Sequence, residues 1–581
     1  MPTRVAIDPI TRIEGHLRIE LETDAQKITK AWSESTQFRG IETIVKGRDP
    51  RDAWAFTQRI CGVCTGTHAV ASIVAVENAI GSQPPEQARL IRDMVLASQG
   101  VQDHTIHFYH LHAMDWVNVA SAAQADPEAA AEFARSIGST WKGNTVERFA
   151  QVRDTVQGIL DSGQLTIFAS GYWDHPDYRL PPEANLMAVS HYLDALEFQR
   201  SMIRINTVFG GKNPHPNFLV GGMACTIDQD RSESINQVHI DQIKVWIDET
   251  VEFVKTCYLP DALAIMSVYP DYFDIGAAQP NFIAVGRNGA TYAGDPADSR
   301  ITSPYTDIKP GVLLDGDLTT VHPFDPAKIA EYITSAWYTY EAGDDVALTP
   351  DEGETTVKYT GPTPSPDMWL GDSDKYTWSK APRYDGRAVQ VGPLARILLA
   401  YAQGDARTRE LVDSAAGTLG ITLDQLNSTG GRTLARAVEA VTTAEVLAEK
   451  TFPAFVANIQ KGDISVFDAT KWEPSSWDKK TSGYSLLEVA RGNLSHWVSI
   501  ENGKVARYQA VVPTTWLAGG RDAEGNQGPY EESLAGNGQH PLVDPDQPLE
   551  PLRTIHSFDP CMACAVHVLD PEGRQLQVVT S

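Results

Sequence analysis

The chain has 581 residues, of which 42% are hydrophobic and 21% are charged, and it contains no run of 18 apolar residues that could cross a bilayer. We therefore expect a soluble globular protein with a large core and exclude disordered and membrane-spanning proteins. Forty-eight basic residues against 75 acidic residues give a formal net charge of −27, which repels phosphate backbones, so no nucleic-acid partner is expected.

The first elements predicted along the chain are strands, followed by two helices. Residues 3–23 alternate between apolar and polar side chains, and KITKAWSEST continues this pattern, which predicts strands around a turn. Asp49 and Pro50 form a helix start, and the helical pattern breaks near Cys61 and resumes until Gly81. The first CxxC pair is therefore predicted to lie between two helices.

Helical periodicity dominates the middle of the chain. The predicted helical stretches are residues 86–116, 127–162, 184–209, 232–257, 325–341, 393–460 and 484–490. Residues 343–386 are rich in Gly, Pro, Asp and Thr and predict a long ordered loop or a small insertion. Near the C-terminus, alternation on both sides of Glu501-Asn502-Gly503 predicts a hairpin. We expect an α+β fold that is predominantly helical, with β-rich terminal segments around a central helical bundle.

Four of the six cysteines form two CxxC pairs, Cys61 with Cys64 and Cys561 with Cys564, near opposite ends of the chain. Each pair is expected near a helix start, where backbone N–H groups favour thiolates, so the four sulfurs can hold one soft metal ion. A structural zinc site is the commonest use of paired CxxC motifs, although zinc ribbons close much shorter loops. A thioredoxin-like redox pair is the third interpretation, but neither motif lies in a clear strand-to-helix unit.

Eight short motifs make the sequence resemble the large subunits of nickel-iron hydrogenases. In chain order they are DPITRIEGH, FRGIE, RICGVCTGTHA, DHTIHFYHLHAMDW, GGKNPHP, ARGNLSHW, YQAVVPTTW and SFDPCMACAVH. The match runs from residue 4 to the C-terminus and is closest to uptake hydrogenases of the respiratory type. It implies the hydrogenase large-subunit fold as a single large domain over residues 1–567. It also implies reversible, heterolytic cleavage of H2, with H2 uptake as the expected direction.

The resemblance assigns the metal ligands. Cys61, Cys64, Cys561 and Cys564 would bind nickel, and Cys64 and Cys564 would also bridge to an iron that carries carbon monoxide and two cyanides. Soft thiolates suit a redox-active nickel. The resemblance further implies that the Cys561 thiolate is the first proton acceptor and that Arg491 lies above the metals as a candidate participant in catalysis.

Glu14, in the RIEGH motif, matches the family's proton gate, a carboxylate within reach of the Cys561 sulfur. A Glu in a dry site can have its pKa raised toward neutrality and can then accept and release protons. Without the motif, an exposed strand Glu is the simpler interpretation.

Four further residues match positions around the metals. His68 would hydrogen-bond to a bridging sulfur, although a helix-capping or core His is the simpler interpretation. Asp103 and Asp559 match the acidic partners of the buried Arg491 guanidinium. Thr514 matches a hydroxyl that contacts a cyanide, with an ordinary strand Thr as the alternative.

A magnesium site and a processing site are also implied. Glu42 and His567 match the family's buried Mg2+ ligands, together with a main-chain carbonyl from residues 509–512 and with water. The family's maturation protease cuts between His567 and Val568, so residues 568–581 are expected to be a removable extension.

Other histidines cluster in one short segment and raise the question of a second metal site. No carboxylate or thiol pattern accompanies them, so we favour a packed amphipathic helix over a metal site. The histidines are His104, His107, His110 and His112.

The remaining two cysteines, Cys225 and Cys257, cannot bind an iron-sulfur cluster of the all-cysteine kind, so electrons must leave through a partner. The resemblance implies an iron-sulfur small subunit in a heterodimer, with a dimer of heterodimers as an alternative assembly. It also implies metal-insertion proteins, and a membrane cytochrome or quinone-linked acceptor.

No basic region followed by an apolar stretch begins this chain, so we expect no secretory signal of its own. The resemblance implies co-export with the small subunit to the periplasmic side of the membrane. Cytoplasmic residence is the alternative. Two other function classes fit the sequence less well. A quinone-reducing respiratory-complex subunit would lack the cysteine ligands, and a zinc-stabilised scaffold would not need Glu14, Asp103, Arg491 or the extension.

Overall fold

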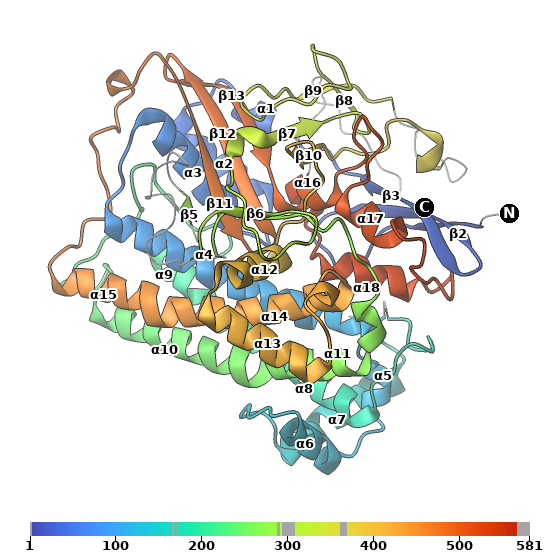
Figure 1. Ribbon diagram of the computed structural model, residues 1–581. Coiled ribbons are helices and arrows are strands. Elements are labelled where there is room, and N and C mark those ends of the chain that lie inside the picture. The colour runs from blue at the N-terminus through green and yellow to red at the C-terminus, as the bar shows by residue number, and fades with distance from the viewer. Residues whose placement is uncertain are drawn as a thin grey trace.

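The computed structural model describes residues 3–165, 168–169, 171–287, 291–292, 308–360 and 369–565. It confirms an α+β fold, in which long helices gather on one side of the molecule and small antiparallel sheets lie on the other (Figure 1). One large hydrophobic core cluster includes side chains from the N-terminal strands, the central helices and the C-terminal segment. Among the described residues, no helix has the length and apolar character needed to cross a bilayer.

The helices with their bounds are α1 Ile41–Val45, α2 Ala53–Thr57, α3 Thr67–Ile80, α4 Glu86–Ile106, α5 Val119–Ala122, α6 Pro127–Ser136, α7 Val146–Ser162, α8 Pro182–Met202, α9 Arg204–Gly210, α10 Gln237–Phe253, α11 Leu259–Val268, α12 Pro393–Gln403, α13 Ala406–Leu419, α14 Thr429–Val446, α15 Phe452–Gln460, α16 Pro513–Ala518, α17 Pro529–Ala535, α18 Leu549–Ser557 and α19 Met562–Ala565. The strands are β1 Thr3–Ile7, β2 Leu17–Asp24, β3 Lys27–Ser35, β4 Phe282–Ala284, β5 Thr291–Tyr292, β6 Gly311–Leu313, β7 Ile329–Tyr332, β8 Tyr338–Thr339, β9 Thr356–Val357, β10 Ala381–Tyr384, β11 Lys480–Val489, β12 Gly492–Glu501 and β13 Lys504–Val511.

The predicted N-terminal strands are confirmed as an antiparallel sheet in the order β1-β2-β3. Leu17, Ile19 and Leu21 alternate along β2 and are buried, which is the period-two pattern that the sequence predicts. The loop over residues 8–16, between β1 and β2, carries the RIEGH motif. This sheet therefore presents Glu14 from a loop and not from a strand.

The first CxxC pair lies between two helices, as predicted. The Asp49 side chain caps the turn that begins at Pro50 by accepting from Arg51 N. α3 follows the cysteines and ends at Gly81, whose φ of 72° suits a glycine C-cap. α3 packs against β11 and β12, so the cysteine loop is held between a helix and the C-terminal sheet.

The prediction of a helix at residues 484–490 is wrong, because this stretch forms the end of strand β11. The C-terminal sheet has the order β13-β12-β11-β5, and the predicted hairpin at Asn502-Gly503 joins β12 to β13. The last residues of β11 are buried on both faces, and such a short apolar run cannot be assigned to helix or strand from its periodicity. A second tight turn, Ala490-Arg491, joins β11 to β12.

The prediction of a helix at residues 325–341 is also wrong. This segment forms a short 3-10 turn followed by β7 and β8, which pair with β10 and β9. Burial alternates along β7, and its Ile and Tyr side chains favour strands. The partner strands β9 and β10 lie within 343–386, so this predicted loop contains short strands in its described part.

The remaining helical predictions are confirmed with breaks. α4 continues into a π-helical turn over His107–His112, and the stretch 393–460 is divided into α12, α13, α14 and α15. The two ends of the chain also meet. Glu14 forms an isolated β-bridge with Cys561, and the Met562 N–H donates to the Glu14 carbonyl at 2.7 Å.

Candidate metal centre

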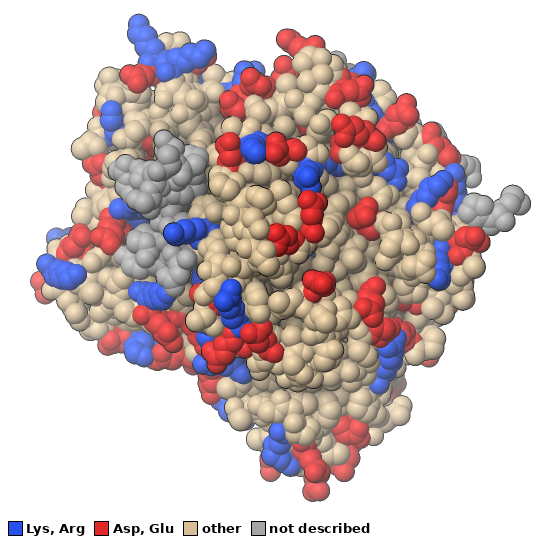
Figure 2. Space-filling model, viewed as in Figure 1, with Lys and Arg blue, Asp and Glu red and all other residues tan. Residues whose placement is uncertain are grey.

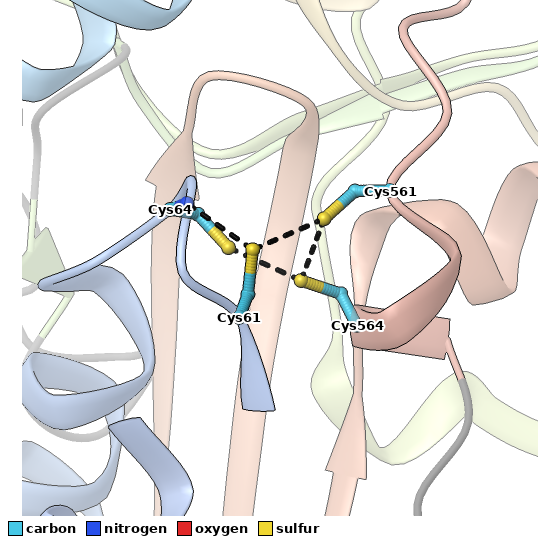
Figure 3. A group of neighbouring side chains, drawn as sticks. All are labelled: Cys61, Cys64, Cys561 and Cys564. Carbon is cyan, nitrogen blue, oxygen red and sulfur yellow. Dashed lines mark hydrogen bonds between the residues drawn. The ribbon is translucent and has the colours of Figure 1, made fainter. Parts of the chain in front are cut away.

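Four cysteine side chains point toward one another in the core (Figure 3). Cys61 and Cys64 come from the loop before α3, and Cys561 and Cys564 come from the segment around α19. The Sγ atoms of Cys561 and Cys564 are 2.9 Å apart, those of Cys64 and Cys564 3.1 Å, and those of Cys61 and Cys561 3.4 Å. All four side chains are buried, and their sulfurs lie within 4.8 Å of one another.

The cluster has the chemistry of a site for a soft cation. Burial raises the pKa of Cys561 and of Cys564 well above that of a free thiol. Four thiolates at these separations repel one another unless a cation lies among them. The N–H groups of Val63 and Cys64 donate to Cys61 Sγ at 3.3 and 3.2 Å, which favours a thiolate there. Sulfur ligation suits nickel, zinc or an iron-sulfur cluster.

Glu14 lies beside this cluster. Its Oε2 accepts from the Cys561 Sγ at 3.4 Å and from the Ala563 N–H at 3.0 Å. Gly15 lets the two segments approach, since a Cβ at its φ of 83° would lie 2.5 Å from Ala563 N. Burial, and then the charge of Cys61, raise the pKa of Glu14 to about 7. Glu14 is thus not the exposed strand residue of the simpler interpretation.

Arg491 reaches the same place from the turn between β11 and β12. Its Nη1 donates to Asp103 Oδ2 at 3.2 Å, and its Nη2 lies 3.1 Å from Asp559 Oδ1. Arg491 also lines a small cavity with Thr514 and three of the cysteines. Burial raises the pKa of Asp103 to about 7, against the opposing effect of Arg491. The structure therefore brings the predicted arginine and both predicted acidic partners together.

His68 contacts a sulfur, and two residues that the sequence analysis missed support it. His68 Nε2 lies 3.4 Å from Cys564 Sγ, and its Nδ1 lies 3.0 Å from His496 Nε2. His496 Nδ1 lies 2.6 Å from the Tyr508 hydroxyl. Burial lowers the pKa of His68 to about 4, so the ring is neutral. His496 belongs to the ARGNLSHW motif, which was the available signal for this contact.

Thr514 lies in α16 and not in a strand. Its Oγ1 accepts a hydrogen bond from the Cys561 N–H at 3.2 Å. The hydroxyl therefore anchors the backbone of a metal-ligand candidate and lies on the wall of the cavity.

Two of the four clustered histidines contact carboxylates. His104 Nε2 lies 2.8 Å from Glu439 Oε2, and His112 Nδ1 lies 3.1 Å from Asp115 Oδ2. Neither contact follows from α-helical spacing, because Glu439 is distant in sequence and Asp115 contacts His112 through a non-α turn. His107 and His110 hydrogen-bond to main-chain carbonyls. The histidines pack with hydrogen-bond partners, which agrees with the favoured interpretation.

Glu42 lies at the start of α1 beside β13. Its Oε1 accepts from the Ala510 N–H at 2.9 Å, and its Oε2 accepts from the Thr355 hydroxyl at 2.5 Å. The structure therefore brings Glu42 to the strand at 509–512. His567, Val568 and the extension 568–581 lie outside the described residues.

Comparisons with known proteins agree on one family. The model of the nickel-dependent hydrogenase family matches residues 39–567, and a model described as HoxL-like matches residues 4–38. The uptake hydrogenase large subunit of Bradyrhizobium diazoefficiens is 44% identical over 589 residues, covering 99% of this chain and 97% of that protein. The hydrogenase-1 large chain of Escherichia coli K12 is 43% identical over 585 residues, covering 99% and 96%.

Solved structures give the same result. The Ni-Fe-Se hydrogenase of Desulfovibrio vulgaris Hildenborough in its as-isolated oxidized state has a TM-score of 0.74 at 29% identity, covering 98% of this chain and 100% of that chain. The reduced Ni-Fe-Se hydrogenase of Desulfomicrobium baculatum has a TM-score of 0.72 at 28% identity, covering 97% and 100%.

Proposed function

The chain belongs to the nickel-dependent hydrogenase family, and we propose that its four clustered cysteines hold the nickel-iron centre of the enzyme. It is the catalytic large subunit of a nickel-iron hydrogenase. The observation that carries the proposed centre is the meeting of four buried thiols, from opposite ends of the chain, at sulfur separations of 2.9 to 3.4 Å. All four would bind nickel, and Cys64 and Cys564 would also bridge to iron.

The side chains around the centre divide the work of heterolytic cleavage. When bound, the metals supply the electron acceptor and the open position at which H2 is polarised. Cys561 Sγ can hold the proton that leaves H2, and Glu14 Oε2 at 3.4 Å can take it up next. The Arg491 guanidinium supplies a fixed positive charge whose position is set by Asp103 and Asp559.

The finer composition of the centre is part of the proposal. Carbon monoxide and two cyanides would complete the iron, and Thr514 and Arg491 are among the polar side chains of the cavity wall that can face such ligands. Glu42, His567 and a carbonyl of residues 509–512 would hold Mg2+. The burial of Glu42 beside Ala510 supports the part of this site that is described.

We further propose an iron-sulfur small subunit as the electron-transfer partner, because Cys225 and Cys257 are the only cysteines left for other work. The large subunit would be a single domain of residues 1–567, and it would form a heterodimer with the small subunit. Metal-insertion proteins and a protease would act during maturation. Acidic and basic side chains are interspersed on the face shown in Figure 2. We propose export to the periplasmic side, in keeping with the uptake hydrogenase relatives, with cytoplasmic residence as the alternative. A cytochrome or quinone-linked acceptor is part of the same proposal.

Metal content tests the proposed centre. The heterodimer purified from its native cells should contain about one nickel per large subunit, together with iron beyond that of the small subunit's clusters. Cys564→Ser should remove the nickel, whereas Cys257→Ser, which changes a buried cysteine outside the cluster, should retain it. Zinc in place of nickel in active protein would return the four cysteines to a structural site.

A further inference from the structure

The turn that carries Arg491 is bonded to a second buried arginine, Arg396 on α12. Arg396 Nη1 donates to the main-chain carbonyl of Val489 at 2.9 Å, and its Nη2 donates to that of Ala490 at 3.0 Å. These are the two residues that precede Arg491. Arg396 therefore holds the backbone at the point from which the Arg491 side chain leaves.

Two carboxylates fix the Arg396 guanidinium. Glu439 on α14 accepts from Nε and from Nη2 at 2.6 Å each, and Glu488 in β11 accepts from Nη1 at 2.7 Å. Each of the five N–H donors of the guanidinium thus has an acceptor. Although burial alone would raise it, Arg396 lowers the pKa of Glu439 to about 2, so the pair stays ionised. Arg396 has one fully bonded orientation available to it.

Glu439 also connects this pair to the carboxylate that receives Arg491. Its Oε2 lies 2.8 Å from His104 Nε2, and His104 follows Asp103 directly on α4. These hydrogen bonds and two peptide links therefore form a closed ring. It runs from Arg491 through Asp103, His104, Glu439 and Arg396, and it returns to Arg491 through the Ala490 carbonyl. The ring constrains Arg491 from its backbone and from its guanidinium at once.

The backbone around the turn leaves little room for adjustment. A Cβ on Gly392, the residue before α12, would lie 2.9 Å from the main-chain oxygen of Arg491. Gly492, which follows Arg491, has a φ of 138°, and a Cβ there would lie 2.5 Å from Val391 Cγ2. α12 and the turn thus approach backbone to backbone, and a shift of Arg396 would be transmitted to Arg491.

We propose that Arg396 and Glu439 are positioning residues that set the Arg491 guanidinium beside the cysteine cluster. The inference rests on the role of Arg491 given under the proposed function. Neither residue hydrogen-bonds to a cysteine in the described part of the chain, so they act through the 489–490 backbone and through His104. A misplacement of about 1 Å in a catalytic group can cost about 100-fold in rate, so these residues can control the reaction without touching the metals.

The test uses the complete heterodimer carrying Arg396→Lys, which keeps the positive charge and loses the fork of donors. Its nickel content should match the wild type, and its rate of H2 oxidation should fall about 10- to 100-fold. The infrared stretching bands of the iron-bound cyanides should shift in the same direction as in Arg491→Lys. Glu439→Gln removes the charge that holds Arg396 and should reproduce both effects, so the test does not depend on one variant folding.

A double variant separates positioning from general stability. Because Arg396 acts through Arg491, adding Arg396→Lys to Arg491→Lys should cause no further loss of rate. Arg92→Lys is the matched control. Arg92 is as buried as Arg396, is bidentate to Glu77 and donates to two main-chain carbonyls, and none of these groups is in the ring. Arg92→Lys should retain the wild-type rate and bands.

Three results would overturn the inference. The first is a wild-type H2-oxidation rate and wild-type cyanide bands in both Arg396→Lys and Glu439→Gln. The second is a loss of rate in the double variant that equals the sum of the two single losses in free energy, and the third is an Arg92→Lys variant that loses as much rate as Arg396→Lys. If Arg491→Lys itself left rate and bands unchanged, the role of Arg491 would fail and the positioning role with it. The cysteine-bound centre would be unaffected by that outcome, because nickel content tests it separately.

Discussion

Glu14 contacts the cysteine cluster through one sulfur atom, that of Cys561. Its carboxylate meets Cys561 at 3.4 Å and is also held by the Ala563 N–H, so it is aimed by backbone as well as by side chain. Burial raises the pKa of Glu14 to about 7, with Cys61 as the second cause. A carboxyl group with this pKa is matched to both steps of proton relay at neutral pH.

Glu14→Gln should keep the shape and the acceptor for Ala563 while removing the ability to carry a proton. Nickel content should be that of the wild type, and hydrogen/deuterium exchange should fall at least about 100-fold. Glu532→Gln is the control, because burial raises the pKa of Glu532 as well although Glu532 contacts no cysteine among the described residues. Exchange that persists in Glu14→Gln would refute the relay.

Three elements far apart in sequence meet at Asp115, just after the π-helical turn. Its carboxylate accepts from Arg12 of the N-terminal loop at 2.5 Å and from His556 Nδ1 of α18 at 2.6 Å. His556 Nε2 in turn donates to the Thr11 carbonyl at 2.7 Å. Both His556 nitrogens thus face oxygen atoms. Asp115 thereby fixes the loop that carries Glu14 against the segment that leads to Cys561.

Asp115→Asn should destabilise the subunit by about 3 to 5 kcal/mol, because it leaves the largely buried Arg12 guanidinium without its carboxylate. Although burial opposes it, Arg12 and His556 hold the pKa of Asp115 well below its usual range. The stabilisation is therefore fully present above about pH 4, the unfolded value, and is lost as the pH falls through the folded value.

Thermal unfolding of the two proteins as a function of pH measures this effect. The gap between wild type and Asp115→Asn should be constant from pH 7 to pH 5 and should narrow in stronger acid. Asp194→Asn, which removes a more exposed partner of Arg148, should cost only about 1 kcal/mol. An equal loss of unfolding free energy in the two variants would show that Asp115 contributes no more to stability than a partly exposed ion-pair partner.

The elements that the sequence predicted well are those with a strong local signal. The alternation in β2, the cap at Asp49 and the glycine stop at Gly81 are local, and the structure confirms each. The helix predictions at 325–341 and 484–490 are wrong because the strands there are short or buried on both faces. A short apolar stretch of this kind does not show the alternation that would identify a strand.

Pairings between distant elements were beyond the sequence. Nothing local to Arg396 or Glu439 indicates that they meet. Because most Arg and Glu residues are exposed, both are predicted from the sequence to lie on the surface. The four cysteines were the exception, because two identical motifs point to one ligand set. His68, Glu14 and Arg491 were placed by resemblance, and their contacts became visible only in three dimensions.

At the scale of the whole molecule, the two ends of the chain close the site together. The N-terminal loop pairs with the segment at Cys561, and the Ile28 N–H donates to the His540 carbonyl at 2.9 Å. The metal site can therefore form only when both ends are in place. This arrangement links the metal site to the segment that precedes the C-terminal extension.

The extension 568–581 begins close to this segment, because Cys564 is buried and His567 is only three positions after it in the sequence. If the extension were kept, its fourteen residues would have to extend away from the metal site in the active enzyme. We therefore predict that the active heterodimer contains a large subunit ending at His567, and that intact-mass spectrometry will find the shorter chain wherever nickel is bound. Nickel-free protein from cells that lack nickel should keep Ser581 as its last residue, since processing follows metal insertion in this proposal. Active, nickel-containing protein that ends at Ser581 would show that the C-terminal segment closes the site without being cut.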